Sequence, residues 1–175
     1  MIEAVFWEDF ASSSYFLRFV LASFYTMQES NQTMKIIETE ILIKADIDKL
    51  WKILTDYERY GEWNKFCPIA ETTGKTGDPL KMTVYLRKGK PTVQTETMKE
   101  NKPYKLGWGL NWGIFLKSHR LQTLEVIENG LVRYYTYDKL WGLLTPLVSF
   151  LYAKAIKEGF ELTAKCLKEY AESRV

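Results

Sequence analysis

The chain has 175 residues, 46% of them hydrophobic, which is enough for one domain with a sizeable core and argues against disorder. Its 24 basic and 22 acidic residues give a formal net charge of +2 with no basic block, which argues against nucleic acid as the main partner. The two cysteines, Cys67 and Cys166, match no metal-binding spacing, so we expect no metal. We expect both thiols to be free and buried in a reducing cytoplasm. We also expect no cofactor.

Residues 1–33 differ in pattern from the rest of the chain. Residues 15–27 (YFLRFVLASFYTM) are largely apolar but shorter than the roughly 20 residues needed to span a bilayer. The residues before them are acidic, which is the wrong charge for a signal peptide. Three interpretations stay open: an appended amphipathic helix, a membrane-surface anchor, or a start codon assigned too early. We therefore divide the chain into an N-terminal extension, 1–33, and a domain, 34–175.

A strand and two short helices are predicted at the start of this domain. Residues 35–43 (KIIETEILI) alternate and end in an apolar run, which is typical of a strand. Asp46 then offers a helix N-cap, and the apolar residues after it recur at helical spacing. A second short helix is predicted over 57–63.

Between Phe66 and Lys139 the sequence predicts strands separated by turns. The turn signals are GDP at 77–79, KGK at 88–90, NKP at 101–103 and NG at 129–130. About six short strands at hairpin spacing indicate one antiparallel meander.

Thr145 and Pro146 predict the start of the last helix, with the threonine as the cap and the proline in the first helical position. Nothing interrupts this helix before Glu172, so it reaches roughly 40 Å, enough to cross the concave face of the sheet.

The two faces of this helix differ in chemistry. Charged residues of both signs form a narrow stripe typical of a solvated face: Lys154, Glu158, Glu161, Lys165, Lys168 and Glu172. The opposite face mixes polar and apolar residues: Ser149, Tyr152, Ile156, Gly159, Thr163, Leu167 and Tyr170. Gly159 weakens a helix by roughly 1 kcal/mol relative to alanine, and either room for a ligand or close contact with a strand would explain it.

Alternation along the strands predicts which side chains line the inside of the sheet. Taking basic residues to mark the outer face turns Trp108, His119 and Asp138 inward, provided that no β-bulge shifts a strand by one residue. A mostly apolar lining with a few polar groups is typical of small-molecule sites. The predicted ligand-binding residues are Phe66, Met82, Trp108, Leu110, His119, Leu121, Tyr134, Thr136, Asp138, Tyr152, Ile156, Gly159 and Thr163.

Three stretches resemble the START/SRPBCC superfamily, in its polyketide cyclase/dehydratase-like branch. They are ADIDKLWKILTDYERYGEWNKF, SHRLQTLEV followed by ENG, and LWGLLTPLVSF leading to KEGFELTAKCLKEY. The resemblance implies an α+β helix-grip fold, in which a curved antiparallel sheet of about seven strands (β-α-α-β6-α) wraps around a long C-terminal helix and encloses an apolar cavity. It implies function less firmly, because the superfamily includes lipid carriers, hormone receptors, cyclases and hydroxylase domains.

Binding or transport of a lipid-like or polycyclic molecule with a polar handle is the first functional expectation. The alternative is a cyclase- or dehydratase-like enzyme acting on a polyketide-type substrate, in which His119 and Asp138 transfer protons as the catalytic residues. A third, weaker interpretation is an interaction module that uses Leu147, Phe150 and Leu151. We expect a cytoplasmic monomer or weak homodimer, with membrane contact only through residues 1–33.

Overall fold

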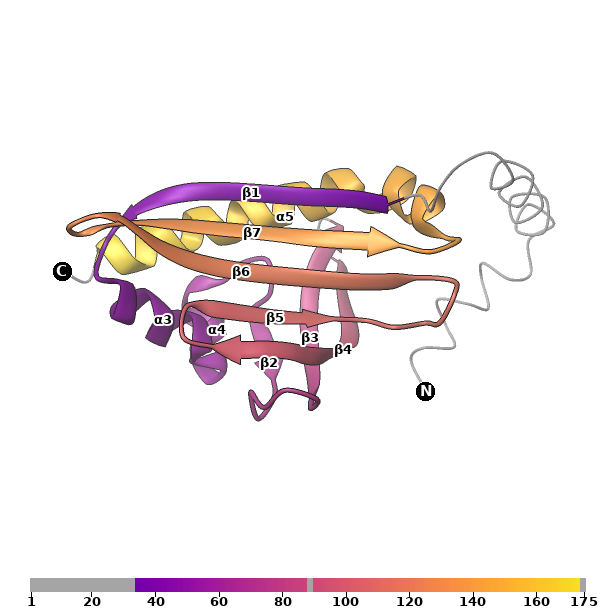
Figure 1. Ribbon diagram of the computed structural model, residues 1–175, viewed down its shortest axis with the longest axis horizontal. Coiled ribbons are helices and arrows are strands. Elements are labelled where there is room, and N and C mark those ends of the chain that lie inside the picture. The colour runs from indigo at the N-terminus through magenta and orange to yellow at the C-terminus, as the bar shows by residue number, and fades with distance from the viewer. Residues whose placement is uncertain (1–33, 88–89, 174–175) are drawn as a thin grey trace.

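The computed structural model describes residues 34–87 and 90–173 (Figure 1). The predictions for residues 1–33 lie outside this range. The elements, in chain order, are β1 (Met34–Lys44), α3 (Ile47–Thr55), the 3-10 helix η1 (Tyr57–Arg59), α4 (Tyr60–Trp63), β2 (Ile69–Glu71), β3 (Pro79–Arg87), β4 (Lys90–Lys102), β5 (Lys105–Gly109), β6 (Lys117–Glu128), β7 (Leu131–Trp141) and α5 (Thr145–Glu172).

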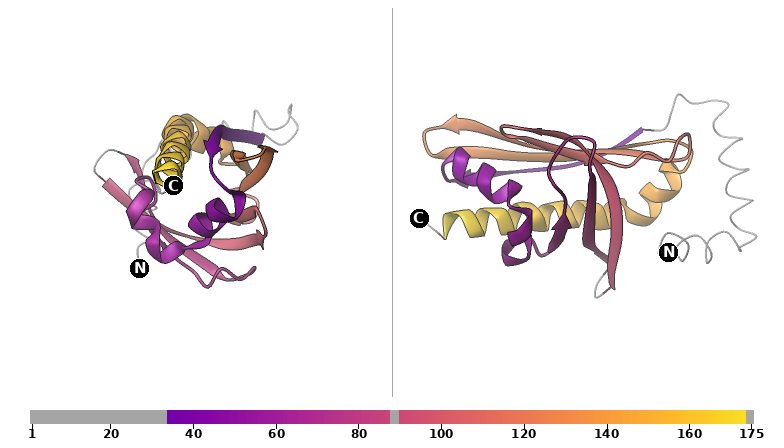
Figure 2. Two further views of the ribbon diagram at one scale, coloured as in Figure 1. Left: turned by 90° about the vertical axis from the view of Figure 1, so that its left-hand side faces the viewer. Right: turned by 90° about the horizontal axis from the view of Figure 1, so that it is seen from below.

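The seven strands form one antiparallel sheet in the order β1-β7-β6-β5-β4-β3-β2. The sheet curves around α5, and the short helices α3 and α4 lie near the C-terminal end of α5 (Figure 2). The predicted α+β helix-grip fold is therefore confirmed. In the part of the chain that the structure describes, no helix is long and apolar enough to cross a membrane.

Local sequence signals explain where α3 begins and how it packs. The side chain of Asp46 accepts hydrogen bonds from the backbone N–H groups of Asp48 at 2.9 Å and Lys49 at 3.0 Å, as its predicted capping role requires. Leu50 and Leu54, one turn apart, are buried on the face that packs into the core.

The long helix α5 begins one residue earlier than predicted. Leu144 occupies the N-cap position and Thr145 is already helical, so the prediction of Thr145 as the cap is wrong. The charged stripe is confirmed as the solvent side, where Lys154 and Glu158 are among the pairs one helical turn apart.

Two lysines of α5 cover one edge of the sheet. α5 runs beside β1, one of the two edge strands, where Lys157 donates to the backbone carbonyl of Glu38 and Lys168 to that of Leu42. Charged side chains along an edge protect it from pairing with another chain.

A β-bulge in β6 determines which residues face the helix. The NG turn pairs Glu128 with Leu131, but the register shifts by one residue at Ile127, so that Val126 pairs with Val132. Every residue of β6 before the bulge is therefore on the face opposite to the one that regular pairing with β7 would give.

Candidate ligand site between the sheet and the long helix

A row of inward-facing side chains crosses the middle of the sheet. Arg120 on β6 lies directly opposite Asp138 on β7 and directly opposite Trp108 on β5. The row continues to Ile37 on β1 and Met98 on β4. Because residues directly opposite in antiparallel strands have Cβ atoms only about 4.5–5.5 Å apart, this register brings a cation, a carboxyl group and an indole together.

Arg120 is buried, at 8% exposure, and its guanidinium lies against two aromatic rings. The guanidinium carbon is 4.1 Å from the ring centre of Phe160 on α5 and 5.2 Å from that of Trp108. No carboxylate oxygen of the described residues comes within ion-pair distance of Arg120, and its Nε has no hydrogen-bond partner among them. A buried cation without a carboxylate partner is costly, so this group is suited to binding a ligand.

Two carboxyl groups face the interior near Arg120. Burial raises the pKa of Asp138 to about 7, and the positive charge of Arg120 opposes this shift. Burial and the negative charge of Asp138 together raise the pKa of Glu96, on β4, to about 8, again against the effect of Arg120. Glu96 accepts a hydrogen bond from the side chain of Gln94, whereas Oδ1 of Asp138 is buried without a partner among the described residues.

The next two inward-facing rows of the sheet add further polar groups. The hydroxyl of Tyr134, a fully buried residue on β7, donates to Oε1 of Gln122 on β6 at 2.7 Å. Nε2 of Gln122 and the hydroxyl of Thr136, which is also fully buried, have no partner within the described ranges. Since buried polar groups are almost always paired, these atoms mark a place where water or a ligand would bind.

Apolar side chains surround these polar rows. They come from most of the strands and from α5: Ile37, Ile43, Leu80, Met82, Val84, Met98, Leu106, Trp108, Leu124, Phe160 and Leu167. The interior thus combines a largely apolar wall with a small group of polar atoms, as small-molecule sites do.

Many predicted ligand-binding residues face this interior. The buried ones are Phe66, Met82, Trp108, Tyr134, Thr136, Gly159 and Thr163. Asp138 belongs to the central row, and Ile156 packs against the core from α5. Leu110 and Tyr152 are half-buried.

His119 and Leu121 face the opposite way from the prediction. In β6 the alternate residues Ser118, Arg120 and Gln122 are buried, so His119 and Leu121 lie on the outer face of the sheet. The His119 ring packs edge-on against Tyr137, with ring centres 6.3 Å apart. His119 and Asp138 therefore do not form a side-chain pair inside the protein, because the bulge at Ile127 reverses the alternation.

Two predicted residues of α5 have structural partners. A Cβ at Gly159 would lie 2.3–2.5 Å from three ring atoms of Phe66, so the glycine admits this ring and leaves no room for a ligand there. The predicted contact with a strand is also wrong, since Phe66 belongs to the segment between α4 and β2. The hydroxyl of Thr163 donates to the carbonyl of Gly159 at 2.9 Å.

The prediction from sequence missed Arg120, Gln122, Glu96 and Phe160. Alternation with basic residues outside predicts Arg120 and Gln122 on the outer face, because basic residues usually lie there. Glu96 gave no signal beyond its position in a strand between other polar residues. The KEGFE stretch contained Phe160, and its place beside a glycine that admits an aromatic ring was the available clue.

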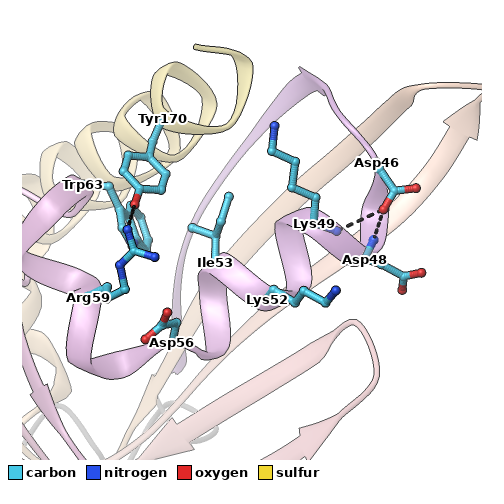
Figure 3. Close-up of a pocket in the computed structure, with 9 residues that line it drawn as sticks. All are labelled: Asp46, Asp48, Lys49, Lys52, Ile53, Asp56, Arg59, Trp63 and Tyr170. Atoms are coloured by element: carbon cyan, nitrogen blue, oxygen red, sulfur yellow. Dashed lines mark hydrogen bonds between the residues drawn. The ribbon is translucent and has the colours of Figure 1, made fainter. Parts of the chain in front are cut away.

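A separate pocket of about 330 Å³ opens at the surface between α3, α4 and the last turns of α5 (Figure 3). Much of its lining is already engaged: Asp46 caps α3, and Arg59 is bonded to Glu62. The hydroxyl of Tyr170 donates to Glu62 at 2.6 Å. These contacts join α5 to the short helices.

Comparison with known proteins places this architecture in a family. Residues 34–172 match the family described as polyketide cyclase/dehydrase and lipid transport. No curated protein shows significant sequence similarity to the chain.

Solved structures share the fold at low sequence identity. A START superfamily protein from Mycobacterium smegmatis is 15% identical, with a TM-score of 0.65 over 83% of this chain and 100% of that one. The Zhui aromatase/cyclase from a Streptomyces species is 11% identical, with a TM-score of 0.65 over 81% of this chain and 96% of that one. Norcoclaurine synthase from Thalictrum flavum, solved with dopamine and hydroxybenzaldehyde, is 11% identical, with a TM-score of 0.64 over 82% and 90% of the two chains. The match over 34–172 shows that the chain, with its helix-grip fold, belongs to the polyketide cyclase/dehydrase and lipid transport family.

Proposed function

We propose that the protein binds or carries a hydrophobic small molecule between its sheet and α5, with the polar end of the molecule on the rows around Arg120, Thr136 and Asp138. The family description, which joins cyclases with lipid transport, fits this function, as do the helix-grip neighbours. The observation that carries the proposal is the group of buried polar atoms without partners among the described residues, set within an apolar wall.

The energetics of such binding are favourable without special chemistry. Removing roughly 300 Å² of apolar ligand surface from water contributes on the order of 7 kcal/mol before ordering costs are subtracted. Hydrogen bonds to the partnerless polar atoms would add to this and would fix the orientation of the ligand. A lipid-like or polycyclic molecule with one polar end fits these requirements.

Mass spectrometry of small molecules extracted from the purified protein tests the proposal. We expect apolar compounds to co-purify, and expect that returning them to the stripped protein raises its melting temperature. A folded protein that yields no such compound, and that no member of a broad lipid and aromatic panel stabilises, would contradict this function.

An enzymatic role is a second candidate, supported by the two interior carboxyl groups. The pKa values of Asp138 and Glu96, raised by burial to about 7 and about 8, suit proton transfer near neutral pH. In this case Asp138 and Glu96, and not His119, would be the acid–base residues. If Asp138→Asn and Glu96→Gln both leave turnover unchanged on a substrate that the wild type converts, this role is excluded.

A cytoplasmic location and a monomeric or weakly dimeric state complete the proposal. Cys67 and Cys166 are free and buried, and burial raises the pKa of the Cys67 thiol to about 11, which keeps it unreactive. Free thiols are common in a reducing compartment.

A further inference from the structure

We propose that the buried end of the ligand is an acid group, a carboxylate or comparable anion, which accepts hydrogen bonds from Arg120 and Gln122. This inference rests on the proposed function, because it specifies the ligand class for the same site.

The partnerless atoms of the site are mainly hydrogen-bond donors. Nε of Arg120 and Nε2 of Gln122 can only donate, and the hydroxyl of Thr136 can donate or accept. A protonated Asp138 adds one more donor at Oδ1 or Oδ2. A ligand group that satisfies these atoms must therefore offer several acceptor lone pairs in a small space, as the two oxygens of a carboxylate do.

The charge balance around Arg120 also favours an anion. The titratable groups that face it come from β4 (Glu96), from β7 (Tyr134 and Asp138), and from α4 and the segment after it (Tyr60 and Cys67). Burial raises the pKa of each of these groups, and α5 contributes the uncharged ring of Phe160. At about pH 6 all five acids are neutral and Arg120 leaves one positive charge to be balanced.

The rings beside Arg120 define the rest of the ligand. Trp108 and Phe160 flank the guanidinium and belong to the apolar wall, so the atoms attached to the acid group would meet aromatic and aliphatic surface. The ligand class is thus an amphipathic acid with an aliphatic or aromatic body.

The sign of the pH dependence follows from the same groups. As pH rises through about 7 and about 8, Asp138 and then Glu96 lose their protons and become negatively charged. Each would then repel a bound anion and would cease to be a donor. Affinity for an acid should therefore fall between about pH 6 and about pH 9, whereas affinity for a neutral ester of the same body should change little.

A pair of fluorescent probes tests this inference on the full chain. Dansyl-labelled undecanoic acid and its methyl ester are titrated against wild-type protein at about pH 6 and about pH 9. At the lower pH we expect the acid to bind at least about tenfold more tightly than the ester. At the higher pH we expect this ratio of affinities to fall by a similar factor.

Variants connect the preference to individual residues. Arg120→Met, which replaces the cation with an apolar side chain of similar length, should remove the preference for the acid, and Arg120→Lys should restore part of it. Arg133→Met is the matched control, since Arg133 lies on the outer face of β7, paired with Glu125. Asp138→Asn and Glu96→Gln keep a donor but cannot ionise, so together they should flatten the pH dependence.

The outcomes separate this inference from the proposed function. Equal binding of acid and ester by the wild type, or a preference for the acid that survives Arg120→Met or grows with pH, would overturn the acid-group assignment while leaving ligand binding intact. Failure of both probes and of the extracted compounds to bind would overturn the proposed function itself. Thermal unfolding of each variant shows whether a lost preference reflects a lost fold.

Discussion

Arg120 owes its place inside the protein to its position relative to one bulge. Without the extra residue at Ile127, His119 and Leu121 would face the helix and Arg120 would lie in solvent. With it, the guanidinium is placed directly opposite Asp138 and against the Phe160 ring. The chemistry of the interior therefore depends on the geometry of a hairpin some distance along the strand.

The interior carboxyl groups should make stability decrease as pH rises. Burial raises their folded-state pKa values to about 7 and about 8, from unfolded values near 4, so the folded state holds more protons between these limits. Their contribution to the free energy of unfolding is full below about pH 4 and is lost as pH rises towards 8.

The measurement is chemical denaturation of wild type and of Asp138→Asn/Glu96→Gln at several pH values. We expect the variant to gain stability relative to wild type by a few kcal/mol between about pH 5 and about pH 9. A difference that stays constant over this range, or changes in the opposite direction, would refute the assignment of the two raised pKa values.

Gly159 is expected to tolerate no side chain while Phe66 is in place. Gly159→Ala should lower the free energy of unfolding by about 1–3 kcal/mol through overpacking, even though alanine favours the helix by about 1 kcal/mol. Its Cβ would overlap the buried Phe66 ring. In a double-mutant cycle, Phe66→Ala should remove the penalty at Gly159. Additive effects of the two changes on the free energy of unfolding would show that the contact with Phe66 is not what excludes a side chain at position 159.

At the scale of elements, α5 both covers the interior and protects the edge of the sheet. Lys157 and Lys168 donate to β1 carbonyls on the side where β1 has no neighbouring strand among the described residues. Replacing both with alanine should leave these acceptors open and increase self-association. Sedimentation velocity would show a larger share of associated species than in wild type.

The neighbouring lysines provide the control for this prediction. Lys154 and Lys165 are more exposed and form ion pairs within α5, with Glu158 and Glu169. Replacing these two with alanine removes the same charge but opens no edge. If both double variants associate equally, the effect is one of net charge and the protective role of Lys157 and Lys168 is wrong.

Periodic elements could be predicted from the sequence, whereas the faces of the strands could only be predicted in part. The Asp46 cap and the uninterrupted run to Glu172 are local signals, and both helices follow them. In β5 and β7, Trp108, Tyr134 and Thr136 face inward as alternation predicts. In β6 the bulge has no local sequence signature, and the assumption that a basic residue lies outside misplaced Arg120 and His119 together.

At the scale of the whole molecule, the described residues, 34–87 and 90–173, contain all seven strands of the sheet and the helix that they surround. Both the family match and β1 begin at Met34. We therefore expect a chain of residues 34–175 to unfold cooperatively, with a melting temperature within a few degrees of the full chain. Loss of cooperative unfolding on this truncation would show that the domain needs residues 1–33.

The location of a bound apolar molecule tests the central claim most directly. A fatty acid carrying a photoreactive diazirine would be cross-linked to the full chain, and the labelled residues mapped by peptide mass spectrometry. We expect labels on inward-facing residues such as Trp108, Met98 and Phe160, competed away by unlabelled acid. Labels confined to the outer face around His119, or to the surface pocket beside Tyr170, would contradict a ligand held between the sheet and α5.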